Sequence, residues 1–208
     1  MFFRRVMIAA AASAPLMACM MGVAQARTPS AAAARAFISD NGDRLVTIIN
    51  SNDSNAQKTT ALRQLVNQIV DVDQVSTYVL GRYNEVATPA QKQRFQELFR
   101  ELLSYNITYQ IRAYKGVQFT VDGATPMAND IVVNTTIAAP EKAPAAVGWV
   151  VEDTPQDQLK IVDVIAEGTS LRITTRNDYA GVIADNGGQV SALLNAMQRQ
   201  INKITAAN

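Results

Sequence analysis

Hydrophobic positions follow two different periods along the chain. Up to about residue 109, and again after Gly168, they recur every three or four residues, whereas between about Gly116 and Ala166 they alternate with polar positions. The first spacing places apolar side chains on one face of a helix, and the second places them on one face of a strand. The pattern therefore predicts an α+β fold in which several helices pack against a sheet.

The helical segments carry recognisable start and stop signals. Thr28-Pro29 is a cap and first-turn pair, and Gly81 is placed to end a short helix that follows a polar break at Asp71 to Asp73. Thr88-Pro89-Ala90-Gln91 is a capping signature at the start of a long helix with one apolar stripe. After the strands, a helix is expected from about Ser170, with a further amphipathic helix at the end of the chain.

The alternating region is expected to form about four antiparallel strands joined as a meander. Its last two strands are apolar on both faces, so helices are expected on one side and a second apolar layer on the other. This favours a curved sheet with an apolar lined interior. The four expected strands are VQFTV, DIVVNTTIA, AVGWVVED and QLKIVDVIA, separated by DGATPMAN, APEKAPA and TPQD.

The first 26 residues are expected to be an export signal. They have a positive end, a short apolar core and the small-residue cleavage pattern Ala24-Gln25-Ala26. Cleavage after Ala26 would place a single domain, residues 27–208, in the periplasm. The alternative is lipid attachment at Cys19, because Leu16-Met17-Ala18-Cys19 resembles a bacterial lipobox.

Composition removes several classes of function. The chain has 48% hydrophobic residues, no histidine and a single cysteine, which lies inside the expected signal. Disulfides, thiol catalysis, cysteine metal sites and histidine-based triads are therefore excluded from the mature chain, and neither a metal nor a cofactor is expected. Removing two arginines with the signal leaves 17 basic and 18 acidic residues, a net charge of −1, which disfavours nucleic-acid binding.

Three blocks of sequence resemble one family. They are VDVDQVSTYVLGRY, TPAQKQRFQELFRELLSYNITY and DVIAEGTSLRITTRNDY. The chain is similar in these blocks to the MlaC-type periplasmic lipid-binding proteins, also called toluene-tolerance proteins, and NGGQVSALLNAM is similar to the hopanoid-associated HpnM branch. The third block is the most specific, because six of its residues fall at the family's spacing: Glu167, Gly168, Ser170, Leu171, Arg176 and Tyr179.

The resemblance implies a carrier without catalytic activity. Such a carrier would hold the tails of a phospholipid or hopanoid in a cavity between the sheet and the helices. It would pass them between an outer-membrane lipid-transfer complex and an inner-membrane ABC transporter complex with its substrate-binding ring. A non-catalytic envelope interaction protein and an enzyme built on a cone-shaped α+β fold are the alternatives.

Lipid-lining residues are expected at the end of the long helix and on the apolar strand faces. Each of them is also explained by ordinary core packing, because large apolar side chains are mostly buried. Trp149 suits the rim of a pocket, since its ring is apolar and its N–H is polar. The full set is Tyr105, Tyr109, Phe119, Ile131, Val133, Trp149, Val151, Val162 and Val164.

Two acids, Asp163 and Glu167, lie in the same stretch as the last strand. Four residues of strand separate them by about 13 Å, which is too far for a glycosidase-type pair. We hypothesise a structural clamp instead. Either Asp163 or Glu167 would pair with Arg176, or Glu167 would accept backbone N–H groups at the turn, and the clamp would fix the helix that starts near Ser170.

Overall fold

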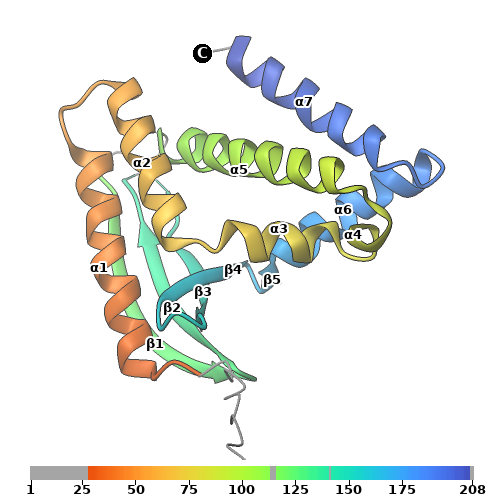
Figure 1. Cartoon of the computed structure of the whole chain (residues 1–208). Helices are drawn as coiled ribbons and strands as arrows, with labels where there is room; N and C mark the ends of the chain where they lie inside the picture. Colours follow the sequence, from red (N-terminus) through yellow and green to blue (C-terminus); the bar gives the residue numbers. More distant parts are fainter. Residues whose placement is uncertain (1–27, 113–115, 141, 207–208) are drawn as a thin grey trace, which may run out of the picture.

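A computed structural model of the chain describes residues 28–112, 116–140 and 142–206. One antiparallel sheet of five strands, which is not closed into a barrel, runs in the order β1-β2-β3-β4-β5 and is strongly curved (Figure 1). The predicted α+β class and antiparallel meander are confirmed. The strands are β1 (Gln118–Met127), β2 (Asp130–Ala138), β3 (Ala145–Asp153), β4 (Leu159–Ala166) and β5 (Thr169–Ser170).

Seven helices are present in the described part of the chain. Helix α1 lies along β1 and β2, while α5 and α7 lie next to each other on the far side of the molecule (Figure 1). None of the described helices is both long and apolar enough to cross a membrane. The helices are α1 (Ala31–Asn50), α2 (Asn55–Ile69), α3 (Val72–Leu80), α4 (Tyr83–Val86), α5 (Pro89–Arg112), α6 (Leu171–Asp185) and α7 (Val190–Ala206).

Most predicted helix boundaries coincide with side-chain caps. The capping box before α5 is confirmed: Thr88 N–H donates to Gln91 Oε1 at 2.9 Å, and Gln91 N–H donates to Thr88 Oγ1 at 3.2 Å. Gly81 ends α3 with a φ of +57°, which favours glycine. The first helix differs from the prediction, because its N-cap is Ser30 rather than Thr28.

Strand β1 is longer than predicted. The segment GATPM was expected to be a loop, but it pairs with β2 as far as Met127 opposite Asp130. A β-bulge between Val121 and Gly123 interrupts the alternation of apolar and polar residues. The second half of the strand therefore does not show the period of two that predicts a strand. Pro126 is tolerated because β1 is an edge strand.

The sheet separates two apolar clusters. The α1-side cluster lies between α1 and the sheet, with Ala34, Ile38, Ile131, Val133, Val151 and Ile161 buried in it. The helical-side cluster lies on the opposite face, where Val150 and Val162 contact side chains from α3, α5, α6 and α7. The apolar layers that the sequence predicted on both faces of β3 and β4 are therefore present.

Candidate functional site

Six of the nine predicted lining residues gather in the α1-side cluster. Three of them are buried and three are partly buried at its margin. The α1-side cluster thus brings together residues from β1, β2, β3 and β4 that are far apart in sequence. These six are Phe119, Ile131, Val133, Trp149, Val151 and Val164.

Trp149 is held inside this cluster by the sheet. Its indole N–H donates to Thr135 Oγ1 at 2.8 Å, and the Thr135 hydroxyl donates to the carbonyl of Val147 at 3.0 Å. Its ring lies 6.4 Å from that of Phe119, centroid to centroid. The indole N–H therefore bonds to the neighbouring strand β2, and the place of Trp149 at the rim of a lipid pocket stays a prediction.

Phe119 defines the contact between α1 and β1. A Cβ atom added at Gly42 of α1 would lie 2.4 Å from the Phe119 ring. Real Cβ atoms do not approach a ring so closely, so glycine at this position lets the helix lie against the aromatic side chain. The Phe119 ring is therefore fixed between α1 and Trp149.

The remaining predicted lining residues lie elsewhere. Val162 is fully buried in the helical-side cluster, and Tyr105 packs against the same cluster. Val162 and Val164 were both expected to line the lipid site, but they pack in different clusters, because a register irregularity between Val150 and Val151 shifts the pairing of β3 with β4. The side chain of Tyr109 lies outside the described part of the structure.

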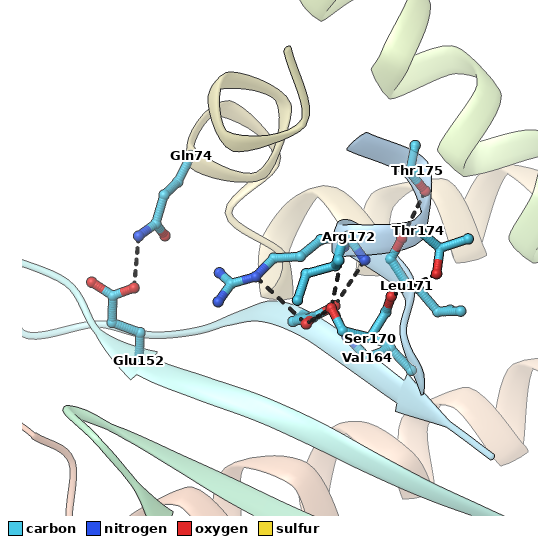
Figure 2. Close-up of polar contacts among 10 residues, drawn as sticks. Gln74, Glu152, Val164, Ser170, Leu171, Arg172, Thr174 and Thr175 are labelled. Carbon is cyan, nitrogen blue, oxygen red and sulfur yellow. Dashed lines mark hydrogen bonds and ion pairs between the residues drawn. The ribbon is translucent and has the colours of Figure 1, made fainter. Parts of the chain in front are cut away.

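Asp163 is the centre of a buried polar network where β4 meets α6. Figure 2 labels the partners around it, Val164, Ser170 and Arg172. Its carboxylate accepts hydrogen bonds from the Ser170 hydroxyl, from Val164 N–H at 2.8 Å and from Arg172 N–H at 3.0 Å. Ser170 is the N-cap of α6 and also accepts a hydrogen bond from Ile173 N–H. The acid and the cap together satisfy backbone N–H groups at the start of the helix.

The arginine beside Asp163 is Arg172, not Arg176. Arg172 Nε lies 3.5 Å from Asp163 Oδ2, whereas Arg176 lies over the ring of Tyr78 at 5.1 Å. The predicted Arg176 pair is corrected, because Arg172 is in the first turn of α6 and Arg176 is one turn further from the strand. A basic residue two positions after an N-cap serine was the signal available in the sequence.

Glu167 and Arg176 have different surroundings from those expected. Glu167 is exposed in the turn between β4 and β5, where its φ is +52°. The guanidinium groups of Arg176 and Arg172 both lie over the Tyr78 ring, and that of Arg172 is 4.5 Å from the ring centroid. The absence of a side chain on Gly81 leaves room for the Arg176 guanidinium, because a Cβ there would be 2.8 Å from Arg176 Nε.

Tyr179, another residue of the family motif, is packed in the helical-side cluster. Its ring meets that of Phe95 edge-on, with the centroids 6.0 Å apart. Burial raises the pKa of Tyr179 to about 12, and the negative charge of Asp178 adds to the increase. Tyr179 therefore keeps its proton through the physiological range and acts as a neutral aromatic residue.

Two open hollows lie beside α1, where it meets the β3–β4 turn and the start of β4. One, of about 390 Å³, is lined by Thr28, Ser30, Asp153, Asp157 and neighbouring residues. The other, also about 390 Å³, lies between α1, the end of α2 and the start of β4. Neither is lined by the predicted lipid-binding residues, and the enclosed lipid cavity stays a prediction. Among the described residues, no group of acids is close enough to hold a metal ion.

Comparisons with known proteins agree with this architecture. A family model described as MlaC protein matches residues 39–199. The toluene tolerance protein ttg2D of Pseudomonas putida is 26% identical over 151 residues, which are 71% of this chain and 69% of that protein. A phospholipid-binding protein of Ralstonia solanacearum, solved in complex with a phospholipid, superposes with a TM-score of 0.72 at 25% identity, covering 83% of this chain and 98% of that one.

Proposed function

This chain belongs to the MlaC protein family, and from that membership we propose that it is a carrier that holds lipid tails in its apolar interior. The observation that carries the proposal is the likeness, over most of both chains, to a Ralstonia solanacearum protein whose structure contains a phospholipid. That likeness also makes phospholipid the first cargo to test, ahead of a hopanoid. Neither relative is named for a reaction.

The α1-side cluster is the proposed place for the tails. It contains six of the predicted lining residues, and on the side away from the sheet it is covered mainly by α1, with the end of α2 beside it. Separating one helix from a sheet exposes less core than separating a layer of packed helices. Lipid tails could therefore enter here while the helical-side cluster keeps the fold intact.

The energetics of such a carrier are nearly balanced. Each buried methylene is worth about 0.8 kcal/mol, so about ten of them contribute roughly 8 kcal/mol in either a bilayer or an apolar protein interior. The carrier therefore sets no direction of transport by itself. We propose that direction comes from an inner-membrane ABC transporter complex with its substrate-binding ring and an outer-membrane lipid-transfer complex, with the carrier moving between them in the periplasm.

Native mass spectrometry of the protein purified from its own envelope, followed by lipid extraction, tests the proposal. The expected result is a bound phospholipid in a one-to-one complex. Recovery of a hopanoid would support the carrier role and show that the cargo is a hopanoid rather than a phospholipid. A protein recovered without lipid under gentle conditions would contradict the carrier and favour an envelope interaction protein.

Two neighbouring residues provide a matched pair of variants for the location of the tails. Val164 and Ile165 are both partly buried, but Val164 packs against the α1-side cluster and Ile165 against the helical-side cluster. We expect Val164→Asn to reduce the lipid recovered by extraction and Ile165→Asn to leave it close to the wild-type amount. Thermal unfolding of both variants controls for folding. The reverse order of lipid loss would place the tails on the other face.

A further inference from the structure

The hollow between α1, α2 and β4 has an unusual distribution of charge. Arg44 and Lys160 both line it, together with the amides of Asn41, Gln68 and Gln158. Of the described residues that line it, none is a carboxylate. The acids Asp153 and Asp157 line the neighbouring hollow instead. An electrostatic field from two cations is therefore concentrated in a space large enough for a small anionic group.

The cations in this hollow are held in position by neutral groups. The Arg44 guanidinium donates to Asn41 Oδ1 and to Gln68 Oε1, both at 2.9 Å, and Asn41 in turn donates to the Phe37 carbonyl at 2.7 Å. Lys160 Nζ donates to the Gln68 carbonyl. Amide and carbonyl partners orient a cation without neutralising it, so both positive charges remain for a ligand.

Part of the lining of the hollow is apolar and is shared with the α1-side cluster. Phe37, Ile69 and Leu159 line the hollow, and all three also pack against the α1-side cluster. Phe37 comes from α1, Ile69 from the end of α2 and Leu159 from the start of β4. A ligand with one anionic end and one apolar end would match both parts of this surface.

We propose that this hollow binds the phosphate group of a lipid whose chains lie in the α1-side cluster. This inference rests on the proposed function and deepens it by naming the end of the lipid that the protein recognises. Arg44 and Lys160 would bind the phosphate oxygens through charge-assisted hydrogen bonds. Phe37, Ile69 and Leu159 would contact the first carbons of the chains. An uncharged lipid of the same chain length would lack the first set of contacts.

Binding of two short-chain lipids tests the inference. Dihexanoyl phosphatidylglycerol carries the phosphate, and dihexanoylglycerol has the same chains without it. We expect the double variant Arg44→Gln, Lys160→Gln to weaken binding of the phosphatidylglycerol by about tenfold or more and to leave binding of the dihexanoylglycerol unchanged. The matched control is Arg199→Gln, Lys203→Gln, which removes one arginine and one lysine from exposed positions of α7 and should change neither affinity.

The outcomes separate this inference from the proposed function. If the wild-type protein binds neither lipid, the proposed carrier function is contradicted. If the wild-type protein and the double variant bind both lipids equally, the carrier stands and the phosphate subsite is overturned. If inorganic phosphate binds as tightly as the phosphatidylglycerol and is lost in the double variant, the hollow is a site for free phosphate. Lys160→Arg keeps the charge and should retain affinity, which guards against a folding defect in the glutamine variants.

Discussion

At the scale of single residues, Asp163 serves three hydrogen-bond donors and one arginine, all at the junction of β4 with α6. Replacing it with asparagine removes the charge beside the buried Arg172 Nε and turns one acceptor into a donor. We expect Asp163→Asn to lower the free energy of unfolding by about 2–3 kcal/mol. Urea denaturation monitored by circular dichroism measures this loss.

Glu167→Gln is the control for that substitution. Glu167 is exposed in the adjacent turn, so we expect its neutralisation to change the free energy of unfolding by less than about 0.5 kcal/mol. Equal losses in the two variants would show that the network around Asp163 does not anchor α6.

Tyr179 predicts a dependence of stability on alkaline pH. Its pKa is raised to about 12 in the folded protein, against an ordinary value of about 10 in the unfolded chain. The folded state therefore binds more protons between these values, and the stability that Tyr179 contributes is lost as pH rises from about 10 to about 12. In urea denaturation, Tyr179→Phe should lose less stability than the wild type between pH 9 and about 11. Parallel losses would contradict the raised pKa.

Residue roles could be predicted from the sequence only where they depend on local neighbours. Ser170 and Gly81 occupy the positions that helix capping requires, and both were identified. The partner of Asp163 depends on how far an arginine side chain reaches across a turn, and Arg176 was chosen instead of Arg172. The face of Val162 depends on one irregular pairing between β3 and β4, which leaves no mark on the apolar pattern.

At the scale of elements, the contact of α1 with β1 predicts opposite effects for two glycine substitutions. In Gly42→Ala, the new methyl group would collide with the Phe119 ring, so we expect destabilisation of about 1–2 kcal/mol in spite of alanine's better helix propensity. Gly181 lies within α6 with open space around it, and Gly181→Ala should stabilise by about 0.5–1 kcal/mol. Chemical denaturation of the two variants measures both changes.

The glycine pair is informative because both changes are chemically identical. If both substitutions stabilise the protein, α1 is free to move away from Phe119 at little cost, and the close contact of α1 with the sheet is not a constraint on the fold. A Phe119→Leu change in the Gly42→Ala background should recover part of the lost stability, because it removes the ring that the methyl group meets.

Elements with a regular period were predicted well, and short or irregular ones were not. The long helix α5 and strand β2 follow one period from end to end. In contrast, α4 has four residues and β5 has two, too few for a period to be recognised. The second half of β1 was missed because its bulge, Gly123 and Pro126 are turn signals when the pairing with β2 is unknown.

At the scale of the whole molecule, the two apolar clusters are expected to respond differently to lipid. If the tails lie in the α1-side cluster, added phospholipid should slow amide hydrogen exchange in α1, β1 and β2 more than in α5 and α7. Hydrogen-exchange mass spectrometry with and without lipid measures the difference. Protection confined to α5 and α7 would place the lipid on the opposite face of the sheet.

The apolar character of the candidate site could be predicted from the sequence, but the position of its charged residues could not. The apolar strand faces identified six residues of the α1-side cluster, because the alternation along a strand assigns each residue to one face of the sheet before the fold is known. Arg44 and Lys160 were not identified, since they are 116 positions apart and meet only after α1, α2 and β4 have packed together. Polar groups that converge across distant elements leave no pattern in the sequence.

The two edges of the sheet have a consequence for association between copies of the chain. Beyond β4, the edge is occupied by Val70, which forms a parallel bridge with Ile161, and by β5. Strand β1 pairs only with β2 within the described sheet, so its outer edge could accept a further strand. Its bulge breaks the regular row of N–H groups, and Pro126 has none to offer. The open edge is thus a poor template for strand addition, which protects a curved sheet of this kind from edge-to-edge aggregation.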